Sequence, residues 1–528
     1  MRFVRLAAVL LTLLGMVGVA GAPARADVLD RLLSVVDEPS GGTAAPRQSA
    51  DLTAWAGEAR STTLPELLQV AVRQAPSLAS ATIDIEIAEA RIQQTWSRND
   101  WLVQAKAQGV RDYLPEIVGS GVVVATEKRF TGTADVSRLL PTGGTIDLHF
   151  DTTYENIGAD GFGYTQWSDN INASLTQPLL KGRGRQLFDA NDAKARLAHD
   201  SATLAKRLAA INTIQAVISA YWDLVLAEQT VAITQQSLDL ARERLRVTQI
   251  GADGGKVARS EIPAVLQIIA TREEDVLTGE LNVLNSSIAL RRSAGLPIGQ
   301  GELGLRVSTD LAVQDQQLEL GSLVERAYAA SPELAQLARQ DASATIDVEV
   351  AENGLLPQLD LALTLGPNGT EDTTTSRHPF NQAWKDVITV ADPAITGSLT
   401  FSRSVGQNDV RGRLREQRET KRKLVVNAFD LRAQLAQTMA RAVAQIELAR
   451  RRVTLSQRAI DLANENIKIE TDRFNLGKST NFDVLNRLED LRQAELRKAQ
   501  AMIDWHKAEI VVDSLTGDVL PKYGIAVP

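Results

Sequence analysis

The chain has 528 residues and a formal net charge of −8, and it shows none of the basic runs that nucleic-acid binding needs. It contains no cysteine, which excludes disulfides, thiolate metal sites and cysteine nucleophiles. Aromatic residues make up 4% and charged residues 23% of the chain, a balance that favours long helices with narrow apolar seams over a thick globular core.

Residues 1–26 are predicted to be a secretory signal peptide. The parts of this signal are a basic start, an apolar core and two small residues before the cleavage point: Arg2, Arg5, Leu6–Val19, Ala24 and Ala26. The alternative is an uncleaved membrane anchor. No later run of about 18 apolar residues occurs, so any further membrane contact must come from strands. Residues 27–61 are expected to form a loose leader segment.

Residues 62–300 are interpreted as a first structural unit of short helices, strands and a long helical hairpin. Thr63 can cap the first short helix, and Pro76 opens the second. Strands are expected over about 101–180, because apolar and polar residues alternate there with a period of two. The alternation is clearest in one run: Ile146, Leu148 and Phe150 against Asp147, His149 and Asp151.

The hairpin of this first unit is expected over about 185–294. From Arg185 to Ile250 there is no glycine or proline, and apolar residues recur every seven positions. These are Leu197, Leu204, Ile211, Ile218 and Val225. The glycine-rich stretch Gly251–Gly255 then ends the helix, and Ser260 can cap the next one.

Residues 318–520 repeat this organisation, with short helices, strands over about 357–404 and a hairpin over about 407–516. The matched positions include Leu64 with Leu320, Pro76 with Pro332, Gly255 with Gly477 and Gly295 with Gly517. Two loops are expected between strands, at Ile157–Tyr164 and at Gly366–Thr389. Residues 521–528 form a C-terminal tail.

The long helix of the second unit carries two apolar seams. One consists of Met439, Ile446, Val453, Ile460, Ile467 and Phe474. The other consists of Leu448, Leu455, Leu462, Ile469 and Leu476. The seams lie about 200° apart around the helix, so the helix has a neighbour on each side, as in a sheet or barrel of helices. The alternative is a central helix in a soluble bundle.

The sequence contains none of the common catalytic or metal-binding motifs. The four histidines are far apart in the sequence and outside any His-Glu-x-x-His frame. Gly477-Lys478-Ser479 resembles the end of a phosphate-binding loop, but position 472 is Asp where that loop needs Gly. We therefore predict no enzyme activity and no cofactor, although carboxylates could still converge from distant positions.

Several stretches resemble the TolC-like family of outer membrane efflux proteins. The resemblance rests on the order of these stretches along the chain and on the duplication: Leu64–Leu78, Gln177–Gly182, Ala220–Val225, Arg473–Gly477 and Asp483–Leu485. It covers about residues 62–520.

The resemblance implies a fold that is mainly α-helical with membrane β-strands. Three identical chains would close a long helical barrel and, with four strands each, a twelve-stranded transmembrane β-barrel. Such a homotrimer would span outer membrane lipid and extend into the periplasm. It would be the passive exit duct of a tripartite efflux or type I secretion system. Its partners would be a periplasmic adaptor and an inner-membrane transporter or secretion ATPase. The alternative is a periplasmic coiled-coil structural protein without a pore.

The resemblance also assigns roles to the hairpin turns. The tips that meet the adaptor would comprise Gly251, Gly254, Gly255, Ser260, Arg473, Phe474, Gly477 and Lys478. Gly251 and Ala252 depart from the family pattern, which expects an arginine and an aromatic residue there. The periplasmic gate would comprise Asp483, Asn486 and Glu261, with Asp483 either forming a ring of carboxylates or simply favouring a helix N-terminus. Phe474 stands where the family has a tyrosine whose hydroxyl helps to latch the two hairpins together. Here that latch is expected to rest on packing of Phe474.

Overall fold

A computed structural model describes residues 60–118, 121–159, 162–255, 257–298, 304–307, 312–313, 318–374 and 376–525. All of them belong to one compact unit, Leu52–Pro528. The expected signal peptide, with Ala24 and Ala26, lies outside the described residues, as do most of the leader and the last three residues of the tail.

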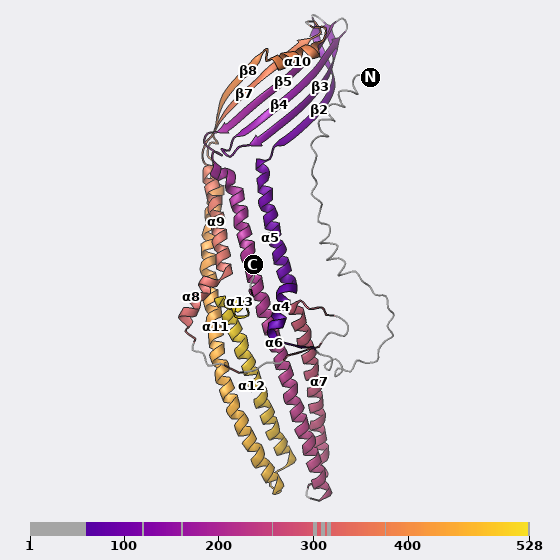
Figure 1. Cartoon of the computed structure of the whole chain (residues 1–528), viewed down its shortest axis with the longest axis vertical. Helices are drawn as coiled ribbons and strands as arrows, with labels where there is room; N and C mark the ends of the chain where they lie inside the picture. Colours follow the sequence, from indigo (N-terminus) through magenta and orange to yellow (C-terminus); the bar gives the residue numbers. More distant parts are fainter. Residues whose placement is uncertain are drawn as a thin grey trace, which may run out of the picture. The chain divides into compact units, whose positions relative to one another are not determined.

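The helices of the two halves come in matched pairs of nearly equal length (Figure 1). The pairs are α4 (Leu64–Gln74) with α8 (Leu320–Ala330), α5 (Pro76–Thr95) with α9 (Pro332–Asn353), α6 (Arg185–Asp253) with α11 (Asn408–Asn475), and α7 (Glu261–Ala294) with α12 (Asn481–Thr516). Both long hairpins are therefore present. Gly295 and Gly517 end the second helix of each hairpin in the left-handed conformation that glycine adopts without strain.

Short elements join the two halves near the middle of the long helices. The strands β1 (Arg60–Thr62) and β6 (Leu305–Val307) pair in parallel. The single-turn helix α13 (Val519–Lys522) packs with β6 into a core around α6, where Ile214, Ile218 and Leu224 are fully buried. A second core lies between α8, α11 and α12.

The sequence-predicted seams of α11 differ in their surroundings. Met439 and Ile446, at the start of the first seam, are buried in the second core. The second seam remains on the surface along its whole length. Its members are 49–71% exposed: Leu448, Leu455, Leu462, Ile469 and Leu476. One side of α11 is thus covered by its own chain and the opposite side is not.

The other described strands form one antiparallel six-stranded sheet in the order β2-β3-β4-β5-β7-β8. The bounds are β2 Leu102–Val118, β3 Gly121–Leu139, β4 Thr145–Ala159, β5 Phe162–Pro178, β7 Gln358–Asp372 and β8 Pro393–Ser402. The edge strands are β2 and β8. The sheet adjoins the start of α6, where the Gly184 N–H donates to the Thr142 carbonyl oxygen at 3.0 Å. The hairpin turns lie at the far end of α6 (Figure 1).

The register of the sheet separates an apolar face from a polar face. Side chains that are two residues apart on a strand, or directly paired across strands, share a face. The apolar face carries Val103, Phe130, Val136, Ile146, Leu148, Phe150, Tyr154, Trp167, Ile171, Leu175, Leu361, Leu363, Leu365, Ile395, Leu399 and Phe401. The polar face carries Gln104, Lys106, Asp135, Asp147, His149, Asp151, Asn170, Asn172, Ser174, Thr364, Ser398 and Thr400.

The structure corrects three expectations about this sheet. In the described part of the chain this sheet has six strands and not four, because the first half alone supplies two antiparallel hairpins. The expected loop Ile157–Tyr164 is mostly strand, since β4 and β5 extend to Ala159 and Phe162. The expected loop Gly366–Thr389 is also wrong, because β7 continues to Asp372 and Pro379–Thr389 forms the helix α10.

One helix in the described part of the chain, α6, is long and apolar enough to cross a membrane. An apolar stretch of 18 residues within it has a mean hydropathy of 1.2. However, 56% of that apolar stretch is buried inside the structure. Helix α6 also holds the core residues Ile214, Val217 and Ile218, each 0% exposed. A buried core helix accounts for its composition.

Candidate functional site

The turn of the second hairpin is a Schellman motif centred on Gly477. The Gly477 N–H donates to the Phe474 carbonyl oxygen at 2.8 Å, and the Lys478 N–H donates to the Arg473 carbonyl oxygen at 2.9 Å. Gly477 has a φ of 71°, in the left-handed region. Gly477 thus gives α11 the left-handed end that glycine favours, and Arg473 and Lys478 are exposed beside it.

Asp483 caps the N-terminus of α12 in this chain. Its Oδ2 accepts hydrogen bonds from the Thr480 N–H at 3.1 Å, the Thr480 hydroxyl at 2.7 Å and the Ser479 hydroxyl at 3.3 Å. The Thr480 side chain accepts in return from the Asp483 N–H, which completes a capping box. These bonds, led by the Thr480 hydroxyl, lower the pKa of Asp483. Asn486, one turn further on, is exposed.

The turn of the first hairpin is built differently from the second. Gly255 adopts a φ of 69°, and the Val257 N–H donates to the Gly251 carbonyl oxygen at 3.2 Å. A Cβ at position 251 would lie 2.9 Å from the Val257 Cγ2, so the turn has little room for a larger residue there. Ser260 stands at the N-cap position of α7 but has helical backbone angles and makes no capping hydrogen bond through its side chain, which corrects the expected cap.

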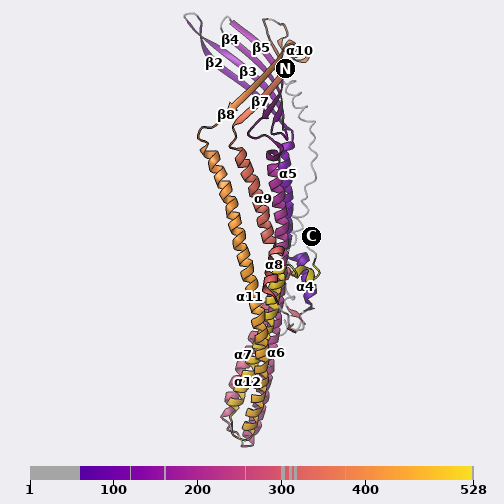
Figure 2. The ribbon, with the colours of Figure 1, turned by 90° about the vertical axis from the view of Figure 1, so that its left-hand side faces the viewer.

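The two hairpins have their turns at the same end of the molecule (Figure 2). A polar network joins the hairpins just behind these turns. The Arg244 guanidinium of α6 lies over the Phe474 ring of α11, 3.9 Å from its centroid. The Arg244 Nε donates to the Asn481 Oδ1 at 2.8 Å. The Asn481 amide in turn donates to the Glu261 carboxylate at the start of α7. Arg244 and Asn481 are buried, with 7% and 3% exposure, and we call these four residues the tip network.

Phe474 packs here against the guanidinium of Arg244, and its role in a latch between the hairpins stays a prediction. The sequence interpretation did not include Arg244 or Asn481. The signal that could have placed Arg244 on a buried face is its spacing from Ala241 and Thr248, which lie three residues before and four after it on the same helix.

An ion-pair network joins the hairpins further from their turns, about two helical turns beyond the tip network along α12. Arg272 of α7 contacts Glu489 of α12, and Arg492 holds the same carboxylate with two hydrogen bonds of 2.8 and 2.9 Å. Burial alone would raise the pKa of Glu489, but the bonds from Arg492 and Gln493 and the charge of Arg272 outweigh it. The pKa falls to about 2. The neighbouring apolar cluster includes Leu485.

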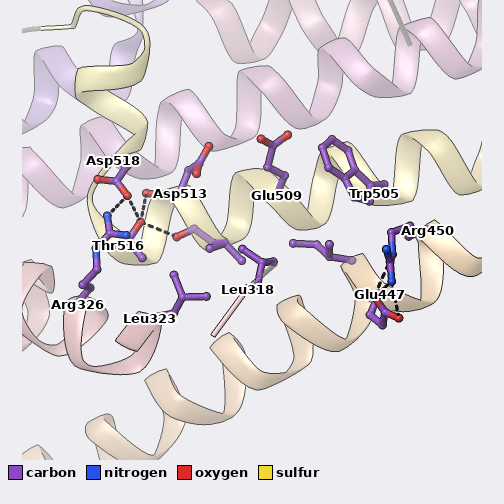
Figure 3. Close-up of a pocket in the computed structure, with 12 residues that line it drawn as sticks. Leu318, Leu323, Arg326, Glu447, Arg450, Trp505, Glu509, Asp513, Thr516 and Asp518 are labelled. Carbon is purple, nitrogen blue, oxygen red and sulfur yellow. Dashed lines mark hydrogen bonds and ion pairs between the residues drawn. The ribbon is translucent and has the colours of Figure 1, made fainter. Parts of the chain in front are cut away.

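A cavity of about 220 Å³ lies where α8, α11 and α12 meet (Figure 3). Its acidic side chains are all paired with cations: Asp518 with Arg326, Glu447 with Arg450, and both Glu509 and Asp513 with Lys522. Figure 3 shows the first two pairs at opposite ends of the cavity. This pairing fits a structural junction better than a substrate site. Among the described residues no cluster of three potential metal ligands occurs.

The described chain is thus a two-faced antiparallel sheet joined to two copies of a long helical hairpin. The chain belongs to the outer membrane efflux protein family, whose sequence profile matches residues 136–296 and 323–518, more than half of the chain. This family is one of TolC-like channels, which places the chain among outer membrane transport proteins and not in an enzyme family.

Named relatives and solved structures agree with this assignment. The chain is 23% identical over 407 residues to the pyoverdine export outer membrane protein OpmQ of Pseudomonas aeruginosa, covering 76% of this chain and 80% of that one. It is 24% identical to nodulation protein T of Rhizobium leguminosarum bv. viciae, covering 76% and 79%. Among solved structures, the outer-membrane channel OprN (TM-score 0.63, 14% identity, 86% and 90% covered) and the Campylobacter jejuni channel CmeC (0.62, 13%, 86% and 85%) share the fold.

Proposed function

We propose that the protein is the outer membrane exit duct of a tripartite export system, passing substrates from a periplasmic adaptor and an inner-membrane pump to the exterior. The observation that carries this proposal is the two-faced sheet. An apolar face over six strands suits contact with lipid, and the polar face suits a water-filled lumen. A periplasmic coiled-coil scaffold would have no use for such an apolar face.

The uncovered seam of α11 supports a homotrimer. Five large aliphatic side chains spaced by seven residues, from Leu448 to Leu476, remain 49–71% exposed. A second uncovered set lies on α7, with Leu266, Leu277 and Leu281 each 45–55% exposed. Packing the seam of one chain against α7 of the next would cover both sets and continue the layer of helices into a closed ring.

The same symmetry would close the sheet. The edge strands β2 and β8 belong to opposite ends of the strand order, so β8 of one chain can pair with β2 of the next and leave no open edge in lipid. Three copies of a six-stranded sheet make an eighteen-stranded barrel, in place of the twelve strands that the resemblance implied. Barrels of about 16–18 strands enclose an aqueous channel, so a wide exit is expected.

The polar face would make this exit selective for cations. Its acidic residues outnumber its basic ones: Asp112, Glu127, Asp135, Asp147, Asp151, Glu155, Asp360 and Asp372 against Lys106 and Arg129. A lumen lined by carboxylates concentrates cations and repels anions.

At the opposite end, we propose that the hairpin turns receive the adaptor and that Asp483 contributes to the periplasmic entrance. Three copies of Asp483 around one axis would form a ring of carboxylates, with Asn486 and Glu261 nearby. The capping bonds of Asp483 all use Oδ2. Its Oδ1 could therefore face the entrance while the cap stays intact.

Native mass measurement in detergent and planar-bilayer recording test the duct and the ring together. A detergent-extracted outer membrane trimer that conducts cations in preference to anions is expected. Multivalent cations added from the periplasmic side should block wild type more strongly than Asp483→Ala. A monomer soluble without detergent would contradict the duct and favour the scaffold. Equal block of a conducting trimer and its variant would leave Asp483 as a helix cap alone.

Gly477→Val should weaken adaptor capture while leaving trimer assembly nearly unchanged. A β-branched residue costs roughly 1–2 kcal/mol in the left-handed conformation, so the turn would rearrange while the seams stay in place. Cross-linking of the adaptor to a probe at Lys478 measures the effect. Gly477→Asn is the matched control, because asparagine tolerates this conformation. Unaltered cross-linking in the valine variant would show that the turn geometry does not matter to the adaptor.

A further inference from the structure

Helix α10 (Pro379–Thr389) lies against the apolar face of the sheet. The Phe380 ring packs on Trp167 of β5 with centroids 4.8 Å apart, and the Trp384 ring packs on Phe150 of β4 at 5.4 Å. Both strand residues belong to the apolar face by register, since Trp167 pairs with Tyr154, four residues along β4 from Phe150. The helix is therefore on the side of the sheet opposite to the polar face.

The strands beneath α10 allow the helix backbone to approach them closely. A Cβ at Gly369 would lie 2.0 Å from the Ala383 carbonyl oxygen, so only glycine allows the helix to come this close. Asp169, the direct neighbour of Gly369 in the sheet, is 0% exposed, and its Oδ1 accepts from the Thr152 hydroxyl at 2.5 Å. The polar residues Asp169 and Thr152 interrupt the apolar face, and α10 lies over the row that contains them and Gly369.

Helix α10 packs on β7 and β5 and reaches β4 through Trp384. β8 pairs with β7 only as far as Pro367, so at Gly369 β7 is the outermost strand of the sheet. A neighbouring chain that extends the sheet would lie in the plane of the strands, beside α10 and not over its outer side. The outer side of α10 is therefore covered by the medium that surrounds the apolar face.

The two flanks of α10 have opposite character. Trp384 and Ile388 lie one turn apart on an apolar flank, and Ile388 is 68% exposed. The other flank carries Gln382 and Asp386, whose side chains are hydrogen-bonded to each other at 3.0 Å. Trp384 contacts Phe150, which lies one row nearer the helical hairpins than the Asp169–Gly369 row. The apolar flank is thus turned toward the middle of the apolar face.

We propose that α10 is an in-plane helix of the outer leaflet, seated at the boundary between lipid headgroups and acyl chains. Its partner is the lipid surface: the Trp384–Ile388 flank meets acyl chains and the Gln382–Asp386 flank meets headgroups and water. In this position it shields the Asp169 carboxylate from hydrocarbon, where an exposed charge is costly. This inference rests on the proposed function, which turns the apolar face toward lipid.

Single spin labels test the position of α10, because the chain has no native cysteine. Ile388→Cys and Asp386→Cys are labelled separately in trimers reconstituted into phospholipid bilayers. Dissolved oxygen, which partitions into lipid, should relax the label at 388, and a water-soluble nickel chelate should relax the label at 386. A label at 388 that is reached mainly by nickel, or by neither reagent, would overturn the proposal.

Two reference labels separate failure of this inference from failure of the proposed function. Leu148→Cys reports the uncovered apolar face, and Ser174→Cys reports the polar face. If oxygen reaches the label at 148 and nickel reaches the label at 174, the apolar face of the sheet meets lipid as proposed. The label at 388 then tests the position of α10 alone. If nickel reaches 148 as readily as 174, the apolar face does not meet lipid and the duct itself is contradicted.

A second variant tests the docking of α10 on the sheet. Gly369→Val, combined with the label at 388, should displace the helix and raise nickel access severalfold. Gly397→Val is the matched control, because Gly397 lies in β8 on the same face of the sheet and a Cβ there would have no atom within 4 Å. Equal nickel access in the two variants would show that α10 does not depend on its contact with Gly369 and would also overturn the proposal.

Discussion

Replacing Arg244 with methionine is expected to raise the open probability of the periplasmic entrance by about tenfold or more. Arg244 is 7% exposed and touches both the Phe474 ring and Asn481, which in turn bonds Glu261. Removing it leaves the Asn481 carbonyl without its donor and removes a cation from an aromatic face. Losses of this kind cost about 1–3 kcal/mol for the buried polar group alone. Single-channel recording of trimers in planar bilayers measures the change.

Controls separate the tip network from general damage to the helix. Arg242→Ala removes an exposed arginine two residues away, which pairs with Glu273, and should leave the entrance unchanged. Phe474→Leu should open the entrance partly, whereas Phe474→Tyr keeps the ring beneath the guanidinium and should behave as wild type. If Arg244→Met and Arg242→Ala conduct alike, the tip network does not hold the entrance.

The long helices could be predicted from the sequence because their physical cause is local and repeated. Uninterrupted runs without glycine or proline, with apolar residues every seven positions, allow few alternatives to a supercoiled helix. The two seams of α11 were also visible, but the sequence alone could not show which seam its own chain covers. That depends on the positions of α8 and α12, which bury Met439 and Ile446 and leave Leu448 and Leu455 exposed.

The sheet was less predictable, for two reasons. Strand pairing is not local, so alternation in β4 indicated a two-faced sheet without revealing how many strands would join it. The segment from Gly366 to Thr389 is rich in polar and turn-forming residues, which favoured a loop. Its helix is stabilised by packing of Phe380 and Trp384 on distant strands, a tertiary effect that outweighs local composition.

The residues at the hairpin turns also include some that the sequence predicts and some that it does not. Gly477 was predictable because a left-handed helix end favours glycine at one position. The tip network was not, because a charged residue such as Arg244 in a long helix is usually solvated. Its burial follows from the meeting of two hairpins whose turns are about 220 residues apart in the chain, as the contact of Glu261 with Asn481 shows.

Acid should weaken the link between α7 and α12 through Glu489. The pKa of this carboxyl is about 2 in the folded protein and 4.5 without its partners. A depressed pKa stabilises the folded state fully above about pH 4.5, and this contribution is lost as the pH falls from 4.5 toward 2. Because Glu489 is partly exposed, with a quarter of its side chain open to solvent, we expect about 1–2 kcal/mol from it at neutral pH.

Thermal unfolding of the helices, followed by circular dichroism at several pH values, isolates this contribution from other carboxyl groups. Glu489→Gln should lower the melting temperature at pH 7, and the gap between wild type and variant should close between pH 4.5 and 2. Asp490→Asn is the matched control, since its exposed carboxylate pairs with Arg487 on the same helix and should change little. A gap that persists unchanged at pH 2 would mean that Glu489 acts through its shape and not through its charge, because only an ionised carboxylate can attract Arg272 and Arg492.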